Sequence, residues 1–69
     1  MKWERVAGNW MQFKGKIKEK WGFFTDDELD EIGGKRDVLI GKIVEKYGIT
    51  RDRAEQAIEE FCKDLDKAA

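Results

Sequence analysis

The residue types most able to do chemistry here are four lysines within seven residues, Lys14, Lys16, Lys18 and Lys20. Ammonium groups at this density bind phosphates, and a basic helix that also carries tryptophan can lie on an anionic membrane surface. Residues 1–24 hold six Lys or Arg against two acids, a net charge of +4, whereas residues 25–33 hold five acids and no base, a net charge of −5. Pairing between these two segments within the molecule is the simpler interpretation of the same lysines. Both interpretations stay open.

Two glycines, Gly15 and Gly41, fall inside predicted helices, where Gly costs about 1 kcal/mol relative to Ala. Either a weak helix former is tolerated on a solvated face, or a second subunit or a partner backbone approaches closely there. The residues alone do not choose between these interpretations. With the lysines they define a candidate interaction surface, which comprises Lys14, Gly15, Lys16, Lys18, Lys20 and Gly41.

Catalytic and metal sites lack their usual residues. The sequence has no His and a single Cys, Cys62, which removes the common general base and leaves too few ligands for a structural zinc site. The acidic stretch that starts at Asp26 fails the calcium-loop pattern, because its sixth position is Glu31 rather than Gly. Cys62 falls on an apolar stripe and is expected to be a small buried hydrophobe. We therefore predict that the protein is not an enzyme and has no catalytic residue, metal or cofactor.

Apolar residues at steps of three and four predict four helices. Gly22 and Gly48 supply C-terminal stops, and the sequence from Thr25 to Glu28 is a capping box. Thr50 caps the last helix. The predicted helices cover residues 3–21, 25–32, 38–47 and 50–67.

The chain also repeats itself. Residues 15–22 and 41–48 match at six of eight positions, and the same offset of 26 residues pairs Gly8 with Gly34. A slip of one residue then pairs Thr25 with Thr50. Two repeat units result, at about residues 8–32 and 34–58, with the last helix continuing to about residue 67. Each unit is a long helix, a Gly turn, a Thr cap and a second helix.

A helical hairpin can bury its apolar face only against another element, and the repeat makes two hairpins. We therefore predict an all-α domain over residues 1–69, with four helices as two helical hairpins packed across each other and an approximate internal two-fold repeat. Ile40 and Val44 of the second unit replace Lys14 and Lys18 of the first, so the third helix should be the central one. The predicted core comprises Trp10, Phe13, Ile17, Trp21, Leu39, Ile43, Tyr47, Ile58, Phe61 and Leu65.

Length and charge limit the remaining possibilities. With 69 residues the chain is one small domain, and a net charge of −1 disfavours bulk attraction to nucleic acid. No stretch approaches the roughly 18 apolar residues that a membrane span needs. A single unpaired thiol fits a reducing compartment, so we expect a cytoplasmic protein.

Several segments together resemble the CsbD-like family: Gly8-Asn9-Trp10, residues 13–22, Thr25-Asp26-Asp27 and residues 34–48. The resemblance covers about residues 7–58, whereas Gly33 departs from the family pattern, which tends to have a polar residue there. It implies a small bacterial general stress-response protein with a four-helix fold of two hairpins. The family has no established molecular activity, so the resemblance carries over no catalytic or ligand residues.

The function predicted from the resemblance and the residues is non-enzymatic, stoichiometric binding to a partner, which is a protein or a second copy of the chain. Two alternatives stay open. The Lys-rich first helix could bind nucleic acid or an anionic surface, in which case binding would fall steeply with salt. The chain could instead be a hydrophilic stress protectant, although three Trp residues and ten core positions argue against full disorder.

Overall fold

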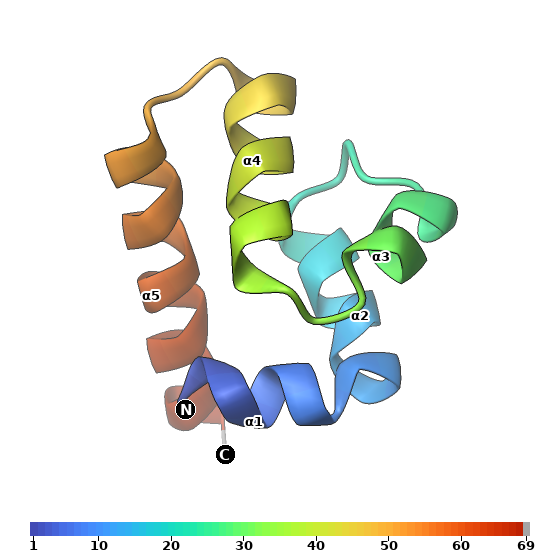
Figure 1. Cartoon of the computed structure of the whole chain (residues 1–69). Helices are drawn as coiled ribbons and strands as arrows, with labels where there is room; N and C mark the ends of the chain where they lie inside the picture. Colours follow the sequence, from blue (N-terminus) through green and yellow to red (C-terminus); the bar gives the residue numbers. More distant parts are fainter. Residues whose placement is uncertain (69) are drawn as a thin grey trace.

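The computed structural model describes residues 1–68, which form helices joined by short loops (Figure 1). No β-strand occurs among these residues, so the predicted all-α class is confirmed. The helices are α1 (Trp3–Gly8), α2 (Trp10–Lys20), α3 (Asp26–Ile32), α4 (Arg36–Tyr47) and α5 (Arg51–Ala68).

The predicted count of four helices is wrong at one point, because Asn9 divides the first helix in two. Its backbone leaves the helical region, with φ −121° and ψ 41°. Its side-chain amide donates a hydrogen bond to the Arg5 carbonyl at 2.9 Å. A short polar side chain that bonds its own backbone competes with the helix, and Gly8 beside it is a weak helix former. The chain turns there, and α1 no longer continues the line of α2.

The predicted caps of the later helices are present. The Thr25 hydroxyl accepts from the Glu28 backbone N–H at 3.2 Å while the Glu28 carboxylate accepts from the Thr25 N–H at 3.0 Å, which closes the capping box. Thr50 likewise accepts from the Arg53 N–H at 3.2 Å. Gly33 and Gly48 end α3 and α4 in the left-handed conformation that Gly adopts without strain.

The starts of the helices follow the offsets of the sequence repeat. The first residues of α2 and α4 are 26 apart, and those of α3 and α5 are 25 apart. Figure 1 shows α4 and α5 side by side and antiparallel, α3 on the other side of α4, and α1 across the lower end. The central place of α4 agrees with its wide apolar face. The two crossed hairpins with a two-fold relation are not confirmed and stay a prediction.

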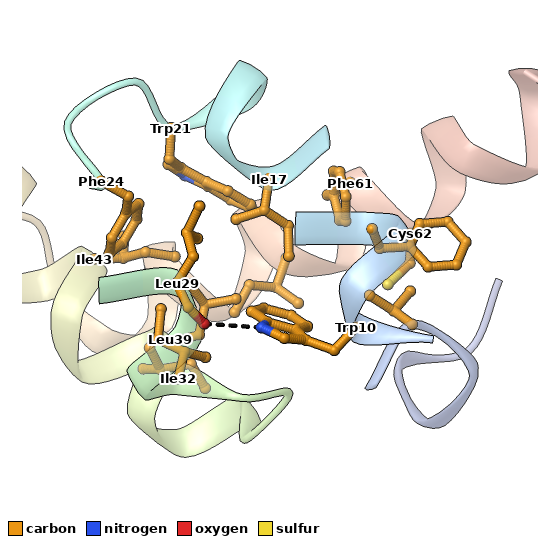
Figure 2. Close-up of a cluster of buried hydrophobic side chains, with 14 of the residues drawn as sticks. Trp10, Ile17, Trp21, Phe24, Leu29, Ile32, Leu39, Ile43, Phe61 and Cys62 are labelled. Atoms are coloured by element: carbon orange, nitrogen blue, oxygen red, sulfur yellow. Dashed lines mark hydrogen bonds between the residues drawn. The ribbon is translucent and has the colours of Figure 1, made fainter. Parts of the chain in front are cut away.

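One apolar cluster holds these helices together (Figure 2). Nine of the ten predicted core residues are buried, and the tenth, Tyr47, is half-buried with its ring stacked on Phe23 at 5.0 Å between centroids. The core also includes residues that we did not predict there: Val6, Phe24, Leu29, Ile32, Ile40 and Ala54. Cys62 is buried in the same cluster, as expected from its place on the stripe of α5.

Trp10 joins two helices within this core. Its ring is 9% exposed, and its indole N–H donates to the Leu29 carbonyl of α3 at 2.8 Å, as Figure 2 shows. Trp3 of α1 meets the Trp10 ring edge to face, with 6.0 Å between centroids. The tryptophans of the first segment therefore serve packing.

Candidate functional site

Two of the four lysines of the predicted surface form ion pairs within the molecule, and all four lie on α2. The Lys14 ammonium contacts the Asp30 carboxylate at 2.8 Å, and Lys18 contacts Asp26 at 2.9 Å. Both acids belong to α3, so the charge pairing expected between these segments is present. The hydrogen bond from Lys18 lowers the pKa of Asp26, and the hydrogen bond to Asp30 raises the pKa of Lys14. These two lysines hold α3 against α2.

A second pair of lysines, on α4, forms ion pairs with α3 from the other side. Lys42 and Lys46 of α4 contact Glu31 at 3.5 Å and Glu28 at 2.6 Å. The hydrogen bond from Lys46, followed by the one from the Thr25 backbone N–H, lowers the pKa of Glu28 to about 2. Four of the five acids of α3 are therefore ion-pair partners for α2 and α4. Among the described residues no group of His, Cys, Asp or Glu is arranged to hold a metal ion.

Acidification is expected to reduce the free energy of unfolding through Glu28. Its pKa is about 2 in the folded state against an ordinary value of 4.5, so its contribution is fully present above pH 4.5 and is lost as the pH falls through about 2. Urea unfolding followed by circular dichroism across this range would measure the loss.

Two variants isolate this contribution. Glu28→Gln, whose amide can keep the capping box, should flatten the slope of stability against pH in this range. The control Glu60→Gln changes an exposed glutamate that makes no ion pair within residues 1–68 and should keep the slope. An unchanged slope in Glu28→Gln would contradict the assignment.

Lys16 and Lys20 have a different environment. Both are exposed, and neither makes an ion pair or a side-chain hydrogen bond within residues 1–68. They line an open groove of about 380 Å³ between α2 and α5, with Phe61 and Leu65 among its lining residues. The Lys20 ammonium lies 5.6 Å from the centre of the Trp21 ring. We call this feature the α2–α5 groove; its lining residues are Lys16, Glu19, Lys20, Phe61, Asp64 and Leu65.

The sequence repeat relates the two lysines of this groove to the two lysines of α4 that pair with α3. Lys42 and Lys46 stand 26 residues after Lys16 and Lys20 and occupy the same places in the repeated eight-residue segment. In the second unit these lysines pair with an acidic helix, whereas in the first unit they border open space. The repeat shows from the sequence that the two lysine pairs are equivalent, but their different environments depend on how the helices pack.

The two glycines of the predicted surface lie on two different helices, and both glycines are exposed. A Cβ added to Gly15 or to Gly41 would meet no atom within 4 Å. The chain itself therefore makes no close approach at either glycine. The predicted surface accordingly divides into two ion-paired lysines, two lysines on the α2–α5 groove and two open glycines.

Gly15→Ala and Gly41→Ala are each expected to raise the free energy of unfolding by about 1 kcal/mol. Ala restricts the unfolded backbone, and the added methyl group has room in the folded protein. Chemical denaturation of each variant and of the double variant would measure the gain, which should be close to additive. A loss of stability in either variant would contradict the open surroundings.

Cys62 has the properties of a packing residue. It is 8% exposed, and burial raises the pKa of its thiol. A raised pKa leaves little thiolate at neutral pH, and the thiolate is the reactive form.

No helix among the described residues is long and apolar enough to cross a membrane.

Comparison with known proteins gives matches along most of the chain. A family model described as CsbD-like matches residues 4–56. UPF0337 protein NE2439 of Nitrosomonas europaea is 53% identical over 68 residues, which cover 99% of this chain and 72% of that protein. UPF0337 protein YjbJ of Escherichia coli K12 is 52% identical over 58 residues, 84% of each chain. UPF0337 protein ECA0631 of Pectobacterium atrosepticum is 50% identical over 58 residues, again 84% of each.

Proposed function

The chain belongs to the CsbD-like family, and from this premise we propose that it is a non-enzymatic stress-response protein that binds a protein partner stoichiometrically. The α2–α5 groove is the proposed contact surface. The proposed partner presents an acidic amphipathic helix with carboxylates toward Lys16 and Lys20. Phe61 and Leu65, which are 5% and 9% exposed, offer this helix a small apolar contact through the edges of their side chains. The proposed compartment is the cytoplasm.

The observation that carries this proposal is the contrast between the two lysine pairs. Lys42 and Lys46 pair with α3, an acidic helix whose apolar side chains Leu29 and Ile32 are buried. The equivalent lysines of the first unit border α5 across the groove, but within residues 1–68 they form no ion pair with it. The molecule thus contains, in α3, an example of the ligand that suits this arrangement: an amphipathic helix that buries its apolar face and presents acids to the lysines.

The acids of the groove do not conflict with an acidic partner. Glu19 and Asp64 also line it. However, the counterpart of Glu19 in the second unit is Glu45, which is exposed and does not prevent the pairing of Lys42 and Lys46 with α3. Acids beside such a lysine pair are therefore compatible with a bound acidic helix.

Phosphate binding has less support from the same contacts. Nucleic-acid affinity grows with the number of ammonium groups that neutralise phosphates. Lys14 and Lys18 are already paired with Asp30 and Asp26, which leaves two of the four lysines on this helix for an outside ligand. A protein helix needs only a short charged edge and a small apolar contact, and the groove offers both.

Site-specific photo-crosslinking tests the proposal. A photo-reactive amino acid at position 19, which lines the groove and is exposed, should give one discrete protein adduct in stressed bacterial cells, and its mass should correspond to one partner per chain. Arg53 is exposed on α5 and does not line the groove, so the same reagent at position 53 should give no such adduct. Mass spectrometry would identify the crosslinked peptide, which should be acidic and amphipathic.

Three outcomes would contradict the proposal. Nucleic acid crosslinked at position 19 would favour the phosphate-binding alternative, and equal adducts from positions 19 and 53 would show that the groove is not the contact. Many different protein adducts without a defined stoichiometry would favour a protective role in bulk.

A further inference from the structure

A second concave site lies at the opposite edge of α5, where the start of the chain meets the start of α4. Its volume is about 480 Å³, within the range of small-molecule sites in proteins. Met1 and Trp3, which are half-buried, contribute the apolar lining, whereas Ile58 and Cys62, at 1% and 8% exposed, contribute little. Arg36, the first residue of α4, lines the same pocket. We call it the Arg36 pocket; it shares no lining residue with the α2–α5 groove.

The polar lining of the Arg36 pocket has an excess of positive charge. Lys2, Arg36 and Lys63 make no ion pair or side-chain hydrogen bond within residues 1–68, although all three line the pocket. Glu59 is the one lining carboxylate without an ion pair in the described part of the chain. The other, Asp66, is paired with the terminal ammonium of the chain. Three unpaired cations therefore face one unpaired carboxylate around mostly apolar walls.

The sequence repeat shows why a charged pocket exists at this place. Arg36 stands 26 residues after Trp10, at the same position in the second unit. The Trp10 ring is buried, and its indole N–H donates a hydrogen bond to the Leu29 carbonyl. Arg36, at the equivalent position, is half-buried and has no ion-pair or hydrogen-bond partner for its side chain in residues 1–68. A guanidinium presents five donors in a planar fork that matches a carboxylate or a phosphate, and partial burial strengthens such a contact.

We propose that the Arg36 pocket binds a small amphipathic carboxylate, whose anionic group is held by Arg36 and whose apolar body lies against Met1 and Trp3. Lys2 and Lys63 add long-range attraction for the same anion. A small inorganic anion would leave the apolar lining unused, and a neutral apolar molecule would leave the guanidinium without a partner. The site thus requires both parts of the ligand.

Decanoate is a suitable probe, and the protein contains its own reporter. The indole N–H of Trp3 gives a nuclear magnetic resonance signal that should shift as decanoate fills the pocket. Trp21 does not line this pocket, and its indole signal serves as an internal control. We expect a saturable 1:1 shift of the Trp3 signal, with a Kd below about 1 mM. Decanol lacks the charge and acetate lacks the apolar body, and each should bind at least about tenfold more weakly.

A pair of arginine variants locates the anion. Arg36→Gln should raise the Kd for decanoate by about tenfold or more. Arg53→Gln removes the same charge from an exposed arginine outside the pocket, so it should leave the Kd within about twofold. Each variant would first be checked by its melting curve, and Lys63→Gln gives a second test that should weaken binding less than Arg36→Gln.

Three results would overturn the proposal. One is no saturable shift of the Trp3 signal up to about 10 mM decanoate. Another is equal affinity for decanol and decanoate, which would remove the role of the charge. The third is an unchanged Kd in Arg36→Gln, which would place the anion elsewhere.

Discussion

Gly34→Ala is expected to lower the free energy of unfolding by about 2–4 kcal/mol. The φ angle of Gly34 is +89°, in a region that L side chains rarely adopt. A Cβ at this position would lie 3.1 Å from the Cα and the carbonyl oxygen of Ala7, so α1 would have to move. That movement would also disturb the hydrogen bond of 3.0 Å from the Trp3 indole to the Gly34 carbonyl. Denaturant unfolding would measure the loss.

Gly48→Ala is the matched control for this prediction. Gly48 also has a positive φ, +63°, but a Cβ there would meet no atom within 4 Å. Only the cost of the left-handed backbone should remain, about 1–2 kcal/mol. The difference between the two variants measures the contact between α1 and the α3–α4 connection. Equal losses would contradict the close approach of Ala7 to Gly34.

Trp10→Ala is expected to cost about 3–5 kcal/mol of unfolding free energy. The ring is 9% exposed and lies between α2 and α3, so its removal leaves a large cavity and breaks the hydrogen bond to Leu29. A 69-residue domain has a total stability of only about 3–10 kcal/mol. Trp10→Ala should therefore unfold much of the protein near physiological temperature, which a thermal melt followed by circular dichroism would show.

Trp10→Phe separates ring volume from the hydrogen bond. Phe keeps most of the ring, and the Leu29 carbonyl still accepts the Gly33 backbone N–H at 3.1 Å, so no buried acceptor is left without a donor. The loss should be well below that of Trp10→Ala, about 1–2 kcal/mol. A larger loss in Trp10→Phe than in Trp10→Ala would contradict the packing role of the ring.

The elements whose signals are local could be predicted from the sequence. The capping box at Thr25, the Gly48 stop and the apolar stripe of α5 depend on residues within one or two turns of each other. The break at Asn9 was missed because the apolar spacing runs on through it. The competing side-chain bond to Arg5 is also local, and Gly8-Asn9 was its only sequence signal.

Features that depend on the arrangement of helices could be predicted only in part. Charge totals indicated that α2 and α3 pair, yet which lysines pair depends on the rotation of each helix about its axis. That rotation places Lys14 and Lys18 toward α3, and Lys16 and Lys20 toward α5. The Arg36 pocket combines three segments distant in the sequence, and no motif marks it.

This division of the lysines also explains why one stretch serves both structure and the proposed binding. Four lysines at alternating positions on a helix fall on its two flanks, two on each. One flank meets the acids of the molecule's own α3, and the other borders the α2–α5 groove. Substitutions on the two flanks should therefore have different consequences.

Two double variants of α2 distinguish its structural lysines from its proposed binding lysines. Lys16→Gln with Lys20→Gln and Lys14→Gln with Lys18→Gln remove equal charge from the two flanks of α2. The yield of the 1:1 partner adduct would be measured in stressed bacterial cells at equal protein levels, with the reagent at position 19, an exposed position that lines the groove. We expect the Lys16 and Lys20 variant to keep its melting temperature and lose the adduct, and the Lys14 and Lys18 variant to melt earlier and keep the adduct while folded. Full adduct yield without Lys16 and Lys20 would contradict the account.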